Sequence, residues 1–270
     1  MRLESYLHRI AWEGPLAPTR DTLGALMRAH VFAVPFENLD VQLGRPISLR
    51  VEDAYRKIVS RGRGGWCYEQ NGVFGWALKQ IGFRVDRVAA AAMRASIGPE
   101  AEANHLALLV TLPGPQDRWL ADVGFGGGLL NPLPLAEATH HHAPFDVGLR
   151  ALPNGRWEFF EQLAGEEVLF DFAPLLADEQ AMGLRSRYLQ THPDSGFVKN
   201  LVCQLRRPGA RVALRGRVYT ELTQEGKTQR QIESREELLA VLRDPFGLEV
   251  PEAGALWDRI CARHAQVFPS

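Results

Sequence analysis

The sequence predicts an α+β fold in three consecutive parts, because helical and strand patterns occupy different stretches of the chain. Apolar residues in 2–82 recur mainly at helical spacing, whereas from residue 84 onward they fall in short strands bounded by turns. Beyond residue 178 helical and strand patterns mix. A chain of 270 residues can build a large core shared by several packed units. We expect the parts to span residues 1–83, 84–190 and 191–270.

The first part contains helices with recognisable ends. The first helix has one apolar face, formed by Leu3, Tyr6, Leu7 and Ile10. Thr19 can cap a second helix, whose apolar positions include Leu23, Leu26 and Met27. A third helix begins at Cys67 and ends before Gly82, with apolar spacing at Val73, Phe74, Ala77, Leu78 and Ile81. Pro35 and Pro46 confine residues 33–48 to an irregular or extended path.

The second part is predicted to be a small barrel or a strongly bent sheet. Its apolar runs indicate strands at 84–93, 105–112, 118–123, 145–152, 156–163 and 166–172. Asn154-Gly155 marks one hairpin turn and Ala164-Gly165 another. The third part is expected to contain a helix over 178–190, strands over 200–207 and 210–223, a helix from a capping box at Ser234 and Glu237 to Arg243, and a last helix over 253–266.

Composition disfavours several functional classes. The 31 basic and 32 acidic residues leave a net charge of −1, which gives no general attraction to nucleic acid or to an anionic membrane. No apolar run reaches transmembrane length, and the first residues do not resemble a signal peptide. The three cysteines are widely spaced, which suits a reducing cytoplasm and offers no zinc-binding spacing. His140-His141-His142 falls in a predicted loop, and we expect no metal there.

One cysteine lies in a setting that is typical of a nucleophile. Cys67 follows Gly64-Gly65-Trp66 and occupies the first turn of a predicted helix. The positive end of the helix dipole favours a thiolate at this position. The two glycines leave backbone space for a substrate to approach the sulfur. Taken alone, these features make Cys67 a candidate.

Two downstream residues can complete a catalytic triad with Cys67. A nucleophilic cysteine needs a base, and the base needs a partner that fixes its tautomer. His105 begins a predicted buried strand, and Asp122 lies near the end of the next one. Because a turn at 113–117 connects the two strands, we expect antiparallel neighbours that bring His105 and Asp122 together. A core histidine without a catalytic role is the alternative for His105 alone, and the three residues together favour the triad.

Four ordered segments of the chain resemble the arylamine N-acetyltransferase family. They are Val34–Asp40, Arg63–Gly72, Asn104–Leu106 and Asp122–Gly126, with further matches at Glu4–Ile10 and, more loosely, at Thr191–Phe197. The resemblance implies that Cys67, His105 and Asp122 form the catalytic triad, in a core like that of cysteine proteases. It also implies a helical domain with the nucleophile, a central β-barrel with His105 and Asp122, and a C-terminal α/β lid.

The same resemblance implies the reaction and its binding sites. Acetyl-CoA donates an acetyl group to the cysteine, and a small aromatic amine or hydrazine then receives it in a ping-pong order. The implied border of the CoA channel is the Gly124–Gly128 loop, with Gly124, Gly126 and Gly127 as its candidate contacts. The implied acceptor pocket contains Phe36, Phe125 and Phe197. The implied charged support beside the site consists of Arg9, Glu37 and Arg63. A further candidate for the CoA phosphates is the cluster Arg206, Arg207, Arg211, Arg215 and Arg217.

Three other functions remain open at this point. The same Cys-His-Asp order occurs in transglutaminase-like and papain-like hydrolases, which release the acyl group to water. An amide synthase would take its acyl group from a carrier protein in place of CoA. A binding protein without catalysis is the third, and an intact triad disfavours it. The natural amine, the preferred acyl chain and the oligomeric state also stay open.

Overall fold

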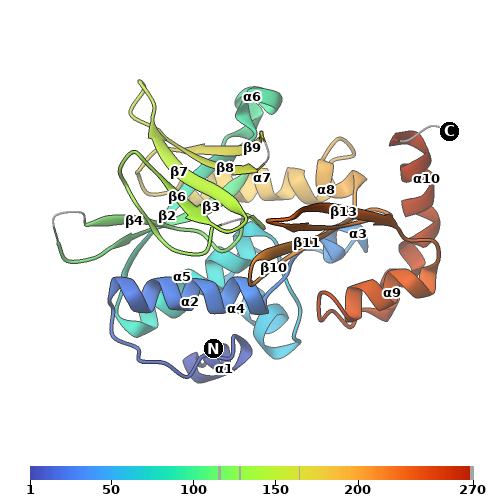
Figure 1. Ribbon diagram of the computed structural model, residues 1–270, viewed down its shortest axis with the longest axis horizontal. Coiled ribbons are helices and arrows are strands. Elements are labelled where there is room, and N and C mark those ends of the chain that lie inside the picture. The colour runs from blue at the N-terminus through green and yellow to red at the C-terminus, as the bar shows by residue number, and fades with distance from the viewer. Residues whose placement is uncertain (115–116, 128, 164, 268–270) are drawn as a thin grey trace.

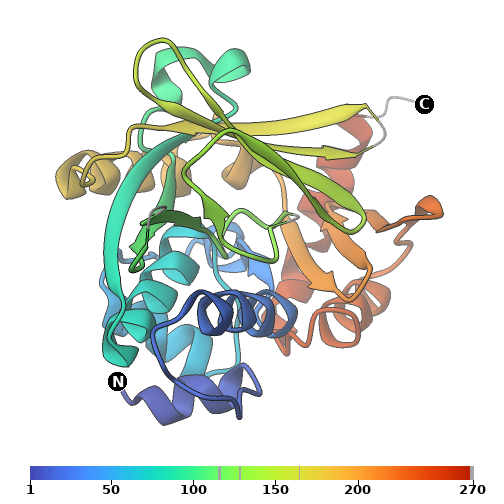
Figure 2. The same cartoon turned by 60° about the vertical axis from the view of Figure 1, so that its left-hand side comes forward.

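The described residues form two antiparallel sheets, a group of N-terminal helices and further helices that flank the sheets. In the views of Figures 1 and 2 the N-terminal helices lie below the first sheet, and the second sheet lies beside it toward the C-terminal helices. The computed structural model describes residues 1–114, 117–127, 129–163 and 165–267. The predicted turn residues Pro115, Gln116 and Ala164, and Gly128 of the Gly-rich loop, lie outside the described residues.

The N-terminal helices begin and end at residues that the sequence marks. They are α1 (Leu3–Arg9), α2 (Arg20–Ala33) and α5 (Cys67–Ile81). The Thr19 hydroxyl accepts a hydrogen bond from the Thr22 amide and so caps α2. Gly82 follows α5 with φ of +105°, in the left-handed region that favours glycine. The predicted start of α2 and the predicted start and end of α5 are therefore confirmed.

The segment between α2 and α5 contains more structure than the sequence predicts. Its elements are β1 (Phe36–Glu37), α3 (Leu39–Gln42), α4 (Val51–Tyr55) and a π-helical turn (Arg56–Ser60). The expected extended or irregular path over 33–48 is correct for β1 and wrong for α3. The Glu37 carboxylate accepts a hydrogen bond from the Leu39 amide at 2.7 Å. This side-chain bond satisfies the first amide of α3. The helix is short and lies between prolines, so the sequence pattern does not indicate it.

Eight antiparallel strands form the first sheet, in the order β5-β4-β3-β2-β9-β8-β7-β6. Figure 2 shows that this sheet is strongly curled. Six of its strands match the predicted ones to within two residues at each end: β2 (Arg84–Ala92), β3 (His105–Thr111), β4 (Arg118–Ala121), β7 (Phe145–Ala151), β8 (Trp157–Leu163) and β9 (Glu166–Phe172). Between β7 and β8, Gly155 has φ of +76°, as the predicted Asn154-Gly155 turn requires.

The first sheet also contains two short edge strands that the sequence did not predict. They are β5 (Leu133–Pro134) and β6 (Ala138–His142). The expectation of a loop at the three histidines is wrong, because β6 pairs with β7 and places His140 opposite Val147 and His142 opposite Phe145. An edge strand pairs on one side only and can be polar on both faces. Its sequence therefore lacks the apolar alternation that reveals inner strands.

The second sheet has the order β1-β10-β11-β12-β13, so a strand from the N-terminal part completes it. Its other strands are β10 (Val202–Arg207), β11 (Ala210–Arg215), β12 (Val218–Thr223) and β13 (Gly226–Gln231). The single strand expected over 210–223 is wrong, because Gly216 turns the chain with φ of +57°. Strand β13 was not predicted, since all of its residues are exposed.

Helices flank the two sheets. They are α6 (Arg94–Ile97), α7 (Glu179–Thr191), α8 (Gly196–Lys199), α9 (Arg235–Arg243) and α10 (Trp257–Val267), with 3-10 turns at Gly98–Ala101 and Pro251–Leu256. Ser234 caps α9 by accepting from the Glu237 amide, whereas the Glu237 carboxylate accepts from the Glu233 amide and does not close the predicted box. None of the described helices is both long enough and apolar enough to span a bilayer.

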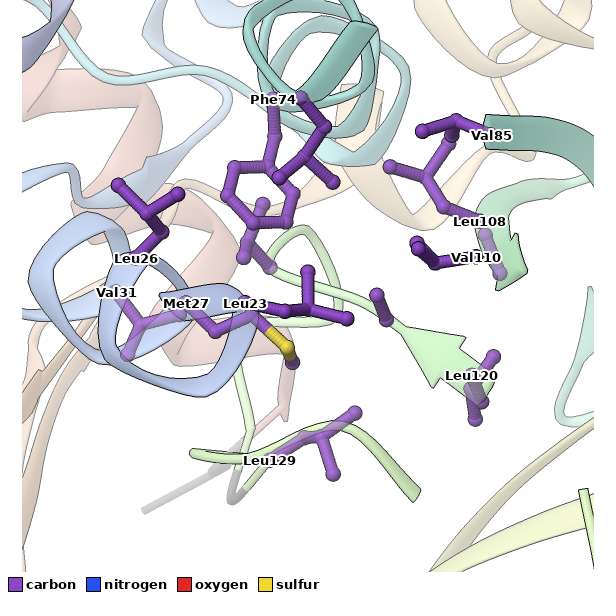
Figure 3. Close-up of a cluster of buried hydrophobic side chains, with 14 of the residues drawn as sticks. Leu23, Leu26, Met27, Val31, Phe74, Val85, Leu108, Val110, Leu120 and Leu129 are labelled. Atoms are coloured by element: carbon purple, nitrogen blue, oxygen red, sulfur yellow. The ribbon is translucent and has the colours of Figure 1, made fainter. Parts of the chain in front are cut away.

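The largest core joins the N-terminal helices to the first sheet. Figure 3 shows part of it, in which Leu23, Leu26, Met27 and Val31 of α2 and Phe74 of α5 face Val85, Leu108, Val110 and Leu120 of the sheet. A β-carbon on Gly75 of α5 would lie 3.3 Å from the Leu108 side chain, so this helix and β3 pack closely. Each fully buried leucine of this kind contributes about 1.5–3 kcal/mol. The core therefore holds the helix that begins with Cys67 against the strand that begins with His105.

Candidate active site

Cys67 is the first residue of α5, and a tight loop sets its position. A β-carbon on Gly64 would lie 2.2 Å from the Pro35 carbonyl oxygen, so the loop can pass here only with glycine. Trp66 is extended, and its amide donates to the Glu69 carboxylate at 3.2 Å. This bond satisfies an amide at the start of α5. The loop thus brings the buried Cys67 to the helix N-terminus, where the sequence predicts it.

His105 opens β3, and Asp122 directly follows β4. The two strands pair antiparallel, with Leu108 opposite Ala121, which confirms the predicted neighbours. His105 Nε2 lies 2.5 Å from Asp122 Oδ2, and both side chains are buried. Because the carboxylate occupies Nε2, the other ring nitrogen, Nδ1, is free to exchange a proton with a thiol or a substrate.

Cys67 lies close enough to His105 to act on the charge of its ring, so the structure brings the three residues of the predicted triad into one place, while the Cys67 thiol donates to the Asn104 carbonyl at 3.9 Å. Burial lowers the pKa of His105. The negative charges of Asp122 and of a Cys67 thiolate, with hydrogen bonds to both, outweigh burial and raise this pKa to about 10. His105 is therefore an imidazolium at neutral pH when it is paired with a thiolate. Such a pair has a nucleophile and a proton donor ready before a substrate arrives.

Asn71 holds the triad carboxylate, although sequence reasoning did not single it out. Its Nδ2 donates to Asp122 Oδ1 at 2.7 Å and to the Leu106 carbonyl at 2.6 Å. Its Oδ1 accepts from the Val123 amide at 3.0 Å. Asn71 lies four residues after Cys67 and so on the same face of α5. That spacing is the signal that could have identified it as a partner of the site.

Phe125 packs against His105. Its ring centroid lies 5.2 Å from that of His105 in an edge-to-face contact. Phe170 lies 4.9 Å from both rings, and Phe159 stacks on Phe170 at 4.7 Å. Phe159 and Phe170 were not predicted as site residues, because a phenylalanine in an alternating strand has the same pattern as any core residue.

Phe36 and Phe197 form a second aromatic contact in the candidate site. Their ring centroids are 6.1 Å apart, and Phe197 also packs edge-to-face on Trp66 at 5.6 Å. Trp66 directly precedes Cys67, so this aromatic pair lies near the candidate nucleophile. Phe36 also lines a cavity together with Phe125, so two of the three predicted pocket residues face one cavity and Phe197 contacts one of them.

Each of the three candidate loop glycines has a packing role in the protein itself. A β-carbon on Gly124 would lie 2.7 Å from Cys67 Cα. One on Gly126 would lie 2.1 Å from Gln204 Oε1, and one on Gly127 would lie 2.0 Å from Glu161 Oε2. At Gly124 the backbone of α5 leaves no room for a side chain, whereas at Gly126 and Gly127 the nearest atoms are the ends of the Gln204 and Glu161 side chains, which can shift.

The predicted charged support forms in part. Arg63 Nη2 lies 2.8 Å from Glu37 Oε1 and 3.3 Å from Asp40 Oδ1. Arg9 instead donates to backbone carbonyls, those of Ala33, Ile58, Gly62 and Arg63. Its guanidinium thus holds α1 against the chain that leads to the cysteine loop. Lys57, which sequence reasoning missed, joins this network as a buried cation.

Two cavities are lined by candidate site residues. The smaller one is lined by Phe36, Asp122, Phe125 and Gln204 among others. The larger one, about 630 Å³, lies between the two sheets and α10, and Gln204 lines both. Its cationic lining consists of Lys199, Arg211, Arg215, Lys227, Arg259 and Arg263. Of the predicted arginine cluster, Arg206 lines the smaller cavity, Arg211 and Arg215 line the larger one, and Arg207 and Arg217 line neither.

The described part of the chain shows no cluster of side chains arranged as metal ligands. No group of three or more His, Cys, Asp or Glu side chains suited to a metal ion occurs among the described residues. On β6, His140 and His142 share one face, with ring centroids 6.5 Å apart, while His141 contacts Asp146 at 2.9 Å. The three cysteines, Cys67, Cys203 and Cys261, are free thiols.

Comparison with known proteins relates this chain to one family. The N-acetyltransferase family model matches residues 19–255. The arylamine N-acetyltransferase of Mycolicibacterium smegmatis is 34% identical over 93% of both chains. The Escherichia coli enzyme of the same name is 30% identical over 93% of this chain and 90% of its own.

Solved structures agree with the sequence comparison. The arylamine N-acetyltransferase of M. tuberculosis superposes with a TM-score of 0.88 at 31% identity, covering 96% of this chain and 99% of its own. The Mycobacterium marinum enzyme, solved in complex with CoA, gives 0.87 at 32% identity over 98% and 99%. Both the sequence and the mixed α/β fold therefore show that this chain belongs to the arylamine N-acetyltransferase family.

Proposed function

We propose that this protein is an acetyl-CoA-dependent N-acetyltransferase that acts on arylamines, arylhydrazines or related amines through an acetyl-cysteine at Cys67. The observation that carries the proposal is the buried His105–Asp122 pair, 2.5 Å apart, with Cys67 as the second partner of the histidine. An acid-base pair aligned on a thiol is the arrangement that acyl transfer through a thioester needs. Membership of the family supplies the donor and the acceptor class.

The first half-reaction loads the cysteine. The Cys67 thiolate attacks the thioester carbonyl of acetyl-CoA, and the C–S bond to CoA breaks as the new C–S bond forms. His105 donates its Nδ1 proton to the departing CoA sulfur. The Cys67 amide, at the first position of α5, has no intrahelical acceptor and is a candidate donor to the oxyanion. Exchange of one thioester for another has little free-energy cost, so the acetyl-enzyme is an accessible intermediate.

The second half-reaction transfers the acetyl group. The amine nitrogen attacks the acetyl-cysteine carbonyl, and His105 accepts a proton from that nitrogen. Collapse of the tetrahedral intermediate forms the amide and expels the Cys67 thiolate. Asp122 keeps the imidazole in the required tautomer throughout, and Asn71 keeps Asp122 in place.

CoA is proposed to occupy the larger cavity, because the smaller one, about 20 Å³, has room for little more than a water molecule. The cavity of about 630 Å³ between the sheets is large enough for much of CoA, and its lysines and arginines suit the phosphates. Gln204 connects it with the smaller cavity beside Asp122. In this proposal Gly124, Gly126 and Gly127 border the pantetheine path with their backbone. Phe36, Phe125 and Phe197 receive the aromatic ring of the acceptor.

Three consecutive parts of the chain are proposed to have different roles in the reaction. The helical part at 1–83 carries the nucleophile, the curled sheet within 84–190 carries His105 and Asp122 as a barrel-like domain, and the part at 191–270 forms an α/β lid. Arg9, Glu37 and Arg63 are proposed to support the cysteine loop from outside the reacting atoms. A cytoplasmic location is supported by the three free thiols, because such thiols persist in a reducing compartment.

Steady-state kinetics test the proposal. Initial rates of CoA release at several concentrations of acetyl-CoA and of an arylamine should give parallel double-reciprocal lines, the signature of a ping-pong order. The Cys67→Ala variant should fold with an unchanged circular dichroism spectrum and lose all transfer. Turnover above about a tenth of wild type in that folded variant would contradict a covalent route. CoA release that is independent of the amine would indicate a hydrolase.

A further inference from the structure

A buried lysine lies at the centre of the charged groups behind the cysteine loop. Lys57 is part of the π-helical turn after α4, and its side chain is 8% exposed. Its Nζ lies 2.9 Å from Glu69 Oε2, 3.0 Å from Asp40 Oδ2 and 3.7 Å from Glu37 Oε1. Burial alone lowers the pKa of Lys57, and these three carboxylates outweigh burial and raise it. Lys57 is therefore a cation at any working pH.

Glu69 connects this lysine to the nucleophile. It is the third residue of α5, and the same oxygen that accepts from Lys57 also accepts from the Trp66 amide at 3.2 Å. A β-carbon on Gly65 would lie 3.0 Å from that oxygen, so the carboxylate fills the space beneath the glycine turn. Trp66 directly precedes Cys67. One carboxylate oxygen thus joins a buried cation to the backbone that positions the sulfur.

Burial makes the Glu69 carboxylate dependent on its cation. Burial raises the pKa of Glu69 and the nearby charge of Glu37 raises it further, whereas Lys57 opposes both effects. Among the described residues, Lys57 is the one cation within 4.0 Å of this carboxylate. Without it, Glu69 would take up a proton or turn toward water, and the Trp66 amide would lose its acceptor.

The other charged groups packed around this pair have different partners. Arg63 binds Glu37 and Asp40, and Arg9 donates to backbone carbonyls. The titratable groups that interact with Cys67 are Tyr68 and His105, and Asp122 contacts His105. None of these groups can replace Lys57 at the Glu69 oxygen. Arg63 and Arg9 already have other hydrogen-bond partners, and the remaining groups do not contact Glu69 as cations.

We propose that Lys57 is a positioning residue for the nucleophile: it holds Glu69 as a carboxylate against the Trp66 amide and so fixes the turn in which Cys67 meets His105. Lys57 also offsets the charge of Glu69, which would otherwise oppose a thiolate two residues away. The inference rests on the proposed thiol mechanism, in which the reactivity of Cys67 depends on its placement beside the imidazolium.

The test measures thiol reactivity without any acetyl donor. The full-length protein is treated with iodoacetamide over a range of pH, and modification of Cys67 is followed by mass spectrometry. We expect Lys57→Met to slow alkylation at neutral pH by about tenfold, the scale of one lost charge-assisted hydrogen bond, and to move the pH profile upward. Lys79→Met is the matched control, because Lys79 is an exposed lysine in the last turn of α5, the helix that begins with Cys67.

A second substitution separates positioning from general damage. Adding Glu69→Gln to Lys57→Met keeps an acceptor for the Trp66 amide without a buried charge, so it should restore most of the lost alkylation rate. Equal rates for the single and double variants, or a wild-type profile in folded Lys57→Met, would overturn the proposal. If Lys57→Met does not fold, the Glu69→Ala variant provides the test. In that variant Lys57 still has Asp40 and Glu37 as ion-pair partners, so its charge stays paired. Slow alkylation of that variant is expected, and a wild-type rate would refute the role.

The same preparation distinguishes this inference from the proposed function. Wild-type protein that alkylates at Cys67 but never accepts an acetyl group from acetyl-CoA would refute the acetyltransferase mechanism and leave the positioning role intact. Wild-type protein that is acetylated normally, together with an unaffected Lys57→Met variant, would refute the positioning role alone.

Discussion

Replacing Gly124 by alanine tests how closely the loop after Asp122 packs on the nucleophile. The new β-carbon would lie 2.7 Å from Cys67 Cα and 2.8 Å from Asn71 Nδ2. Ordinary van der Waals contact begins at 3.4 Å, so the loop or the start of α5 must move by roughly 0.7 Å. Gly124 is not among the residues with positive φ, so alanine adds a contact without backbone strain.

The expected magnitude follows from that displacement. Overpacking of this kind costs about 1–3 kcal/mol of folding free energy, which a stable domain tolerates. A reacting group displaced by about 1 Å can lose roughly 10²-fold in rate. We therefore expect Gly124→Ala to unfold cooperatively at a slightly lower temperature and to lose roughly 10- to 100-fold in kcat/KM, with most of the loss in kcat.

The assay compares this variant with Gly183→Ala. Nothing lies within 4 Å of a β-carbon on Gly183 in α7, and alanine within a helix stabilises by about 0.5–1 kcal/mol relative to glycine. Thermal unfolding and initial rates with acetyl-CoA and an arylamine are measured for both variants. Wild-type kcat/KM in Gly124→Ala would refute the close packing of the loop on Cys67. A similar loss in Gly183→Ala would show that the effect is not local.

Two further predictions concern protonation. Asp122→Asn can keep the bond from Asn71 to Oδ1 but presents an N–H to His105 Nε2, which forces the tautomer that cannot accept a proton at Nδ1. We expect about a 10⁴-fold loss of kcat, as for the corresponding change in a serine protease triad, together with slow alkylation of the Cys67 thiol. A wild-type alkylation rate at neutral pH would be inconsistent with the assigned geometry. The second prediction concerns His30, whose pKa burial lowers to about 3. Because the unfolded chain binds a proton below about pH 6.5 and the folded one does not, stability falls as pH drops from about 6.5 toward 3, by about 2 kcal/mol at pH 5. Denaturant unfolding at pH 7.5 and pH 5 should show this extra loss in wild type and not in His30→Gln, and equal losses in both would count against it.

Much of the fold could be predicted because its inner elements carry strong periodic signals. The Cys67 helix has apolar residues at helical spacing and a glycine at its end, and β3 is an uninterrupted apolar run. Elements without such a signal were missed. Strand β6 is a polar edge strand, and β13 is exposed along its whole length. The pairing of β1 with β10 joins Phe36 to Gln204, and no local pattern reveals a contact over that separation.

The candidate site also contains residues that the sequence pattern indicates and residues that it does not. The order of Cys67, His105 and Asp122 predicts a catalytic triad, and a short turn between two apolar strands was enough to predict that His105 and Asp122 meet. Asn71 and Lys57 were missed, because a polar residue within a helix gives no sign of whether it faces water or a buried carboxylate. Their roles depend on burial and direction, which tertiary packing determines.

The most direct test of the account is the intact mass of the protein after brief mixing with acetyl-CoA in the absence of an amine. The account predicts the added mass of one acetyl group on wild type, none on Cys67→Ala, and loss of the adduct when an arylamine is added. Release of CoA without any adduct would contradict a stable acetyl-enzyme and indicate hydrolysis. Neither adduct nor released CoA would contradict acetyl-CoA as the donor and favour an acyl group delivered by a carrier protein.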